Sequence, residues 1–287
     1  MSDTGKPLLE VEDLHVTYAT PKGPVEAVRG VSFTLGREKL GIVGESGSGK
    51  SQTGRAILGL TERNGTVTAK TLRFDGVDLL TAGKRTLRNI RGKRISMILQ
   101  DPKYSLNPVM TVGRQIEEAF LVHQKSSRSV ARQRTLEMLK AVRIRDPERV
   151  YRAYPHELSG GMGQRVMIAM MMIPEPDIII ADEPTSALDV TVSLQVLAIL
   201  DDMVERLGSG LIFISHDLNL VASFCDRVLI MYAGRVVETC RADELDKAIH
   251  PYTRGLLNCL PRLDGGGETL PTLKRDPAWA RDPVPGS

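Results

Sequence analysis

The apolar positions near the N-terminus predict strands that lead into a loop and a helix. Residues 8–18 (LLEVEDLHVTY) alternate between apolar and polar side chains, which is the pattern of an edge strand. Residues 27–44 predict a strand, a turn and a second strand, and the second strand runs directly into a glycine-rich loop. Residues 51–60 (SQTGRAILGL), just after that loop, predict a helix. The order is therefore strand, glycine-rich loop, helix.

Short apolar runs farther along the chain predict buried strands. Residues 71–80 predict a strand and a turn, and residues 95–101 (ISMILQD) predict a buried strand. Two more runs, DIIIADE at 177–183 and GLIFISHD at 210–217, flank a predicted helix at about 190–207. Runs of this length that are rich in isoleucine are typical of parallel strands covered on both faces. The pattern predicts an α/β fold with a mostly parallel central sheet and an antiparallel N-terminal β part.

The stretch from about 111 to 173 is mainly helical and interrupts this alternation. We expect one domain over residues 1–262, with a helical subdomain inserted at about 101–175. The glycine- and proline-rich tail, 263–287, is expected to be irregular. The longest apolar run, at 166–173, is much shorter than the roughly 18 residues of a membrane span, and the polar N-terminus is not expected to be a signal peptide.

Composition and charge exclude several classes of protein. Apolar residues make up 41% and charged residues 25%, as in an ordinary soluble globular protein. The net charge of +3 is too small to indicate a nucleic-acid surface. The basic stretch 84–94 lacks interleaved aromatic residues, so we interpret it as a solvated helix face. Three widely spaced cysteines form no C-x-x-C pair, which argues against a disulfide framework and a zinc site.

The glycine-rich loop at 44–51, GESGSGKS, matches the phosphate-binding pattern G-x-x-x-x-G-K-[ST]. Its glycines allow the backbone N–H groups to surround phosphates, and the following helix adds its positive N-terminal end. Lys50 is expected to neutralise phosphate charge, and the Ser51 hydroxyl to coordinate Mg²⁺. The expected nucleotide-binding residues here are Gly44, Glu45, Ser46, Gly47, Ser48, Gly49, Lys50, Ser51 and Gln52.

Polar residues at the ends of other predicted strands supply the rest of a catalytic site. Asp182 and Glu183 end a buried strand, where Pro184 stops it; Asp182 is expected to hold Mg²⁺ and Glu183 to polarise the attacking water. Gln100 and His216 end strands in the same way. We predict that His216 lies near the γ-phosphate and that Gln100 ligates Mg²⁺ or water.

Two further features fit nucleotide binding. Tyr18 is the aromatic residue near the N-terminal strand, and its ring is a candidate for stacking on adenine. In the sequence LSGGMGQR, 158–165, the helix-capping residue Ser159 precedes Gly160 and Gly161. The N-terminus of this helix is therefore a candidate anion-binding site. The methionines that follow are interpreted as core residues.

In this order the motifs resemble the ATP-binding subunit of an ABC transporter, over about residues 8–262. The resemblance implies ATP and Mg²⁺ as cofactors. It also implies that the LSGG signature binds the γ-phosphate of ATP held by a facing subunit, and that the SALD segment crosses the dimer interface. The implied residues are Ser159, Gly160, Gly161 and Gln164 for the signature, Ser186 and Asp189 for the interface loop, and Ser51, Gln100 and Asp182 for Mg²⁺.

Two segments, 100–116 and 250–263 (HPYTRGLLNCLPRL), look like the peptide and nickel importer branch of that family. Such importers have two membrane subunits, two ATP-binding subunits that are homologous or identical, and an extracytoplasmic solute-binding protein. The resemblance places this chain peripherally on the cytoplasmic face of the inner membrane. Cys240 and Cys259 do not match the cysteine-rich pattern of many members, so no iron–sulfur cluster is expected. Gly163 stands where many relatives have Arg or Gln.

The main prediction is an ATPase subunit that powers uptake of peptides or a similar small solute; nickel remains open within that class. A soluble ABC ATPase that acts on nucleic acid or ribosomes is the alternative, but the chain shows neither a long coiled-coil insertion nor tandem domains. A GTPase switch would need an N-K-x-D motif, which the sequence lacks.

Overall fold

The computed structural model describes residues 6–259, 276 and 279, and these form two compact units. Of the described residues, the first unit comprises 6–82, 212–259, 276 and 279, and the second comprises Gly83–Leu211. The tail expected to be irregular, 263–287, lies outside the described residues except for Asp276 and Trp279. No helix in the described part of the chain is both long and apolar enough to span a membrane.

The N-terminal strands of the first unit form an antiparallel sheet, as the sequence predicted, but the prediction of an edge strand at 8–18 is wrong, because β1 is paired on both sides. Strand β1 pairs antiparallel with β2, β4 and β5, and β5 pairs antiparallel with β6. In β1 the core side chains alternate with half-buried or exposed ones, which explains the alternating sequence pattern. The strands are β1 (Leu9–Thr20), β2 (Gly23–Leu35), β4 (Gly65–Thr68), β5 (Thr71–Phe74) and β6 (Val77–Asp78).

A second sheet of the first unit carries the glycine-rich loop. Its strands lie in the order β11-β10-β3-β9, with β10 parallel to β3 and antiparallel to β11. The strands are β3 (Lys39–Val43), β9 (Gly210–Ser215), β10 (Arg227–Tyr232) and β11 (Arg235–Arg241), where the first two residues of β9 belong to the second unit. The helices are α1 (Lys50–Ile57), α9 (Leu218–Phe224), the 3-10 helix η2 (Ala242–Lys247) and α10 (Pro251–Asn258).

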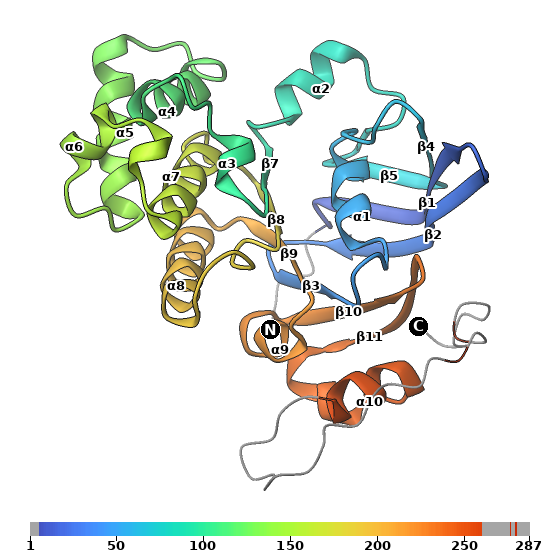
Figure 1. Cartoon of the computed structure of the whole chain (residues 1–287). Helices are drawn as coiled ribbons and strands as arrows, with labels where there is room; N and C mark the ends of the chain where they lie inside the picture. The colour runs from blue at the N-terminus through green and yellow to red at the C-terminus, as the bar shows by residue number, and fades with distance from the viewer. Residues whose placement is uncertain (1–5, 260–275, 277–278, 280–287) are drawn as a thin grey trace, which may run out of the picture. The chain divides into compact units, whose positions relative to one another are not determined.

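The second unit pairs two strands in parallel and gathers most of the helices (Figure 1). The strands are β7 (Ile95–Ile98) and β8 (Ile178–Asp182), and every residue of both is buried. The helices are α2 (Lys84–Ile90), α3 (Pro102–Ser105), α4 (Val112–Leu121), α5 (Arg128–Ala141), α6 (Pro147–Arg152), η1 (Pro155–Glu157), α7 (Gly160–Met172) and α8 (Val190–Leu207). The predicted helical stretch is confirmed, as is the solvated face of α2, where Lys84, Arg85 and Arg88 are exposed.

Side-chain caps set the starts of the main helices of this unit. The side chains of Ser127, Asp146, Ser159 and Asp189 each accept a hydrogen bond from the backbone N–H three residues later, at 2.9–3.4 Å. These bonds satisfy N–H groups that have no partner within a helix. Residues 166–169 of α7 are fully buried, and Met167 and Met172 are core residues as predicted, whereas Met162, Met170 and Met171 are half-buried.

Candidate nucleotide-binding site

The glycine-rich loop, 44–51, connects β3 to α1 and lies against backbone from other parts of the first unit. A Cβ atom on Gly44 would lie 2.1 Å from the carbonyl oxygen of Met231, and one on Gly49 would lie 2.4 Å from that of Ala27. Gly49 also has a φ of 100°, in the region that favours glycine. These close approaches explain why the phosphate-binding pattern requires glycine at its first and sixth positions.

The Lys50 side chain is buried and folds back over the loop. Its Nζ atom donates hydrogen bonds to the carbonyl oxygens of Gly44, at 2.8 Å, and Glu45, at 2.9 Å. The ammonium group is therefore held inside the curve of the loop, at the N-terminal end of α1. Its charge and the positive end of the helix dipole both favour an anion there. Ser51 follows in the first turn of α1, and the Ser48 hydroxyl is buried with no hydrogen-bond partner among the described residues.

Tyr18 of β1 lies beside the helix that follows the loop. Its hydroxyl donates a hydrogen bond of 2.5 Å to Oε1 of Gln52, and its ring approaches the backbone at Gly65. Burial is the main reason that the pKa of Tyr18 is raised, and the nearby Glu62 carboxylate adds to the shift. The structure thus brings together Tyr18 and Gln52, which the sequence had assigned separately to nucleotide binding.

His216 follows β9 directly and is exposed. The next residue, Asp217, donates its backbone N–H to the Ser215 hydroxyl and caps α9 by accepting from Leu220 N at 3.1 Å. This turn places the imidazole at the carboxyl end of its strand, as the sequence predicted. Its proposed approach to the γ-phosphate stays a prediction.

In the second unit, Gln100, Asp182 and Glu183 lie at or just beyond the carboxyl ends of the parallel strands β7 and β8. Ile98 is opposite Ala181 in parallel register, so both strands end at the same edge. Asp182 is the last residue of β8 and is buried, whereas Glu183 has a φ of 46°, in the left-handed region. Because β8 stops between the two carboxylates, they are not constrained to opposite faces and can both serve the same site.

The signature helix and the interface loop are neighbours in the second unit. A Cβ atom on Gly160 would lie 3.7 Å from the Leu188 side chain, and one on Gly161 would lie 2.5 Å from that of Val192. Ser159, Gly160, Ser186 and Asp189 are exposed, and Ser186 donates to the carbonyl oxygen of Glu183. Gln164 differs: it is only 1% exposed. The exposed part of this region therefore comprises Ser159, Gly160, Ser186 and Asp189, and Gly161 is half-buried.

The candidate Mg²⁺ ligands are all oxygen donors, a hydroxyl, an amide and a carboxylate, from Ser51, Gln100 and Asp182. Mg²⁺ is usually held by one or two carboxylates plus substrate phosphates and water, so this donor set fits it. Residues 6–259, 276 and 279 contain no group of three or more His, Cys, Asp or Glu side chains placed to hold a metal ion.

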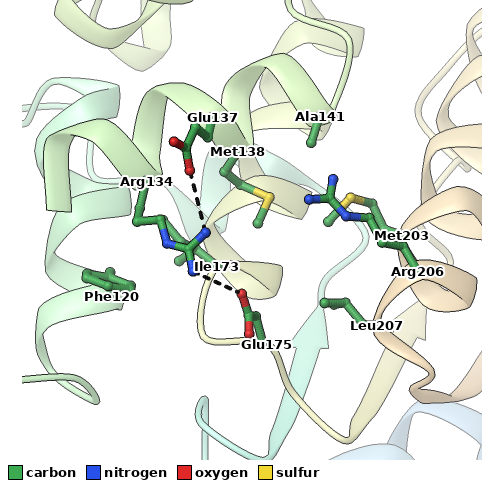
Figure 2. A pocket seen from close by; sticks show the side chains of 10 residues that line it. All are labelled: Phe120, Arg134, Glu137, Met138, Ala141, Ile173, Glu175, Met203, Arg206 and Leu207. Carbon is green, nitrogen blue, oxygen red and sulfur yellow. Dashed lines mark hydrogen bonds and ion pairs between the residues drawn. The ribbon is translucent and has the colours of Figure 1, made fainter. Parts of the chain in front are cut away.

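A cavity of about 140 Å³ in the second unit lies apart from these motifs (Figure 2). Phe120, Met138 and Met203 line it, and Arg134 forms ion pairs with Glu137 and Glu175 across one side. None of the residues predicted from the sequence lines this cavity, so it has no part in the candidate site.

The family model described as ABC transporter matches residues 28–186. The oligopeptide transport ATP-binding protein OppD of Salmonella typhimurium is 48% identical over 272 residues, which cover 94% of this chain and 81% of that protein. A putative peptide import ATP-binding protein of Brucella abortus is also 48% identical, over 93% of this chain and 81% of the relative.

Solved structures agree with this similarity. The chain matches the dimeric ATP-binding cassette MJ0796, in a post-hydrolysis state bound to ADP and Pi, with a TM-score of 0.73 and 27% identity over 82% of this chain and 98% of that one. It matches cbiO1 of Clostridium perfringens, part of the transporter complex cbiONQ, with a TM-score of 0.70 and 28% identity over 84% and 91% of the two chains. The mixed α/β fold predicted from the sequence is confirmed, and the chain belongs to the ABC transporter family as one of its ATP-binding cassettes, the ATPase subunits of these transporters.

Proposed function

We propose that this chain is the ATP-hydrolysing subunit of an importer that takes up peptides or a similar small solute. One observation carries the proposal: the phosphate-binding loop, with Lys50 held inside it, occurs in a chain that shares 48% identity with an oligopeptide transport ATP-binding protein over 94% of its length. The class of transported solute is inferred from the relatives, because the site residues proposed in this chain bind the nucleotide and not the solute.

Nucleotide binding is assigned to the first unit. The phosphates are expected in the loop 44–51, with Lys50 opposite their charge and Gln52 just beyond. Tyr18, held by Gln52, offers its ring to adenine. The oxygen donors that we propose for Mg²⁺ are those of Ser51, Gln100 and Asp182, and the ion when bound neutralises phosphate charge.

Hydrolysis is assigned to groups at the ends of strands. Glu183 orients and polarises the attacking water, and its left-handed backbone conformation is the kind of strained geometry that is often found at functional sites. His216 supports the transition state at the γ-phosphate. Gln100 transmits the binding or loss of nucleotide to the segment that follows it. That segment begins with Asp101, which caps α3 by accepting a hydrogen bond from Lys103 N at 2.8 Å.

A second ATP-binding subunit, homologous or identical, is the proposed facing partner. Ser159–Gly161 of one subunit would close over the γ-phosphate held by the other, with Ser186 and Asp189 at the interface. Val190 and Leu194, which directly follow this loop, are 77% and 61% exposed. Exposed apolar side chains beside polar interface residues support a surface that a partner covers. Gln164, which is buried, would act from inside α7.

Two membrane subunits are the other proposed partners, with a solute-binding protein acting through them. Tyr104 and Val109, just after Gln100, are 88% and 80% exposed and offer an apolar surface for such contacts. This arrangement places the chain peripherally on the cytoplasmic face of the membrane. No observation favours the alternative partners, nucleic acid or ribosomes.

The test uses the complex purified with its membrane subunits. Lys50→Ala should lose nucleotide binding or turnover, whereas Glu183→Gln should still bind ATP and hydrolyse it slower by a factor of about 10²–10⁴. Normal turnover by Glu183→Gln would refute its catalytic assignment. Uptake of labelled peptides compared with a nickel chelate, by vesicles that hold the whole importer, decides the cargo; uptake of neither would refute the proposed cargo class.

A further inference from the structure

One peptide group of the phosphate-binding loop forms hydrogen bonds at both its carbonyl oxygen and its N–H group. The carbonyl oxygen of Gly44 accepts from Lys50 Nζ at 2.8 Å, and the N–H of Glu45 donates to the Tyr252 hydroxyl at 3.1 Å. These two atoms belong to the same planar peptide unit and point in opposite directions. The plane therefore cannot turn without breaking the hydrogen bond to Tyr252, the one to Lys50, or both.

Tyr252 reaches the loop from a distant part of the sequence, 207 residues away, in the first turn of α10. It is fully buried. Its ring centroid lies 4.6 Å from that of Tyr232 and 6.1 Å from that of Trp279, so the ring is packed on two sides. A side chain confined in this way holds its hydroxyl at a fixed position.

The backbone that carries Tyr252 is held as well. Nδ1 of His250 accepts a hydrogen bond from Tyr252 N at 3.1 Å and so caps α10. The Glu238 carboxylate of β11 accepts from Ile249 N at 2.7 Å and from His250 N at 3.3 Å. This chain of contacts connects the sheet to the start of α10 and, through Tyr252, to the loop.

We propose that Tyr252 is a positioning residue for ATP binding. Its hydroxyl fixes the orientation of the Gly44–Glu45 peptide and, through the Gly44 carbonyl, the place of the Lys50 ammonium group. Tyr252 itself touches no reacting atom. The inference rests on the proposed assignment of the loop 44–51 as the ATP site, and it adds α10, in the segment after the last strand, to the machinery that shapes that site.

Tyr252→Phe tests this, because phenylalanine keeps the buried ring and removes only the hydroxyl. The Glu45 N–H then loses this acceptor, and the KM for ATP should rise about fivefold, as expected for the loss of one hydrogen bond. The kcat should stay within about twofold, because Glu183 and His216 are unchanged. The dissociation constant of a non-hydrolysable ATP analogue, measured on the purified full chain, should rise with KM.

Tyr232→Phe is the matched control. It removes a hydroxyl from the same aromatic cluster and keeps the ring that packs on Tyr252. The control should leave the analogue's affinity unchanged. If Tyr252 served only to hold the fold together, Tyr252→Phe would lower the melting temperature while the folded protein bound the analogue normally.

The outcomes separate this inference from the assignment of the ATP site. If Lys50→Ala abolishes binding of the analogue and Tyr252→Phe weakens it, the assignment of the ATP site and the positioning role of Tyr252 are both supported. If Lys50→Ala abolishes binding but Tyr252→Phe binds as tightly as the unaltered chain, the positioning role of Tyr252 is wrong and the site remains. If Lys50→Ala binds normally, the site itself is wrong.

Discussion

Gly163 offers the sharpest test of how the signature helix is packed. It is the fourth residue of α7, inside the helix, where glycine costs about 0.5–1 kcal/mol relative to alanine. A Cβ atom at this position would lie 3.4 Å from Cγ and 3.6 Å from Cβ of Pro102, which is ordinary van der Waals contact. Gly163→Ala should therefore raise the free energy of unfolding by about 1 kcal/mol.

Gly161, two residues earlier in the same helix, is the matched contrast. A Cβ atom there would lie 2.5 Å from Cγ1 of Val192, a stiff β-branched side chain at the start of α8. One of the two helices or the valine would have to move, at a cost of about 1–3 kcal/mol. The same chemical change thus has opposite predicted signs at two positions of one helix.

Thermal unfolding of the purified full chain measures both variants. A change of about 1 kcal/mol corresponds to about 2–4 °C in a protein of this size class, upward for Gly163→Ala and downward for Gly161→Ala. A fall in melting temperature for Gly163→Ala would refute the reasoning, because it would mean that Pro102 cannot accept the added methyl group. Steady-state ATPase rates of both variants then show whether rigidity at Gly163 alters turnover.

Three further predictions follow from single contacts. Ser159→Arg should leave ATP binding by the lone chain unchanged and block hydrolysis by the assembled complex; blocked binding by the lone chain would contradict a site shared between subunits. Tyr18→Ala should weaken ATP binding by about 1–3 kcal/mol through lost stacking, whereas Tyr18→Phe, which keeps the ring, should change it little; equal loss in both would assign the effect to the hydroxyl. Burial lowers the pKa of His250 below its ordinary value near 6.5, so the unfolded state binds the proton more tightly, and stability should fall as pH drops below about 6.5. Urea unfolding between pH 7 and 5 should show a smaller fall for His250→Asn, which keeps a capping acceptor for Tyr252 N; the same fall in both would exclude His250 as the cause.

Much of the candidate site could be predicted because its motifs are local. The loop 44–51 needs glycine where backbone closely approaches backbone, and β8 needs to end at Asp182 so that the two carboxylates are not constrained to opposite faces. Each requirement is met by residues within a few positions of one another. Spacing in the sequence therefore identified the loop, the carboxylates and the capped start of α7 together with their positions on strands and helices.

Contacts between distant segments were not predictable in this way. No pattern in the sequence indicated that the Tyr252 hydroxyl would accept a hydrogen bond from Glu45 N, because the HPYT segment has its own helix cap and apolar residues that any surface helix shares. Nor did the sequence show that Gln164, one turn after the exposed Gly160, would be buried, since helical phase alone does not say which neighbours cover a face. Both facts depend on which elements pack together.

The sequence by itself determined the fold class, the nucleotide-binding motifs and the family, because short-range spacing fixes where strands stop and where helices start. Only the tertiary structure decided that the Gly44–Glu45 peptide donates a hydrogen bond to Tyr252 of α10, and that Gly163 has room for a methyl group while Gly161 has none. The physical reason is that hydrogen bonds and van der Waals contacts depend on distances in space, and residues 207 apart carry no pattern that sets such a distance.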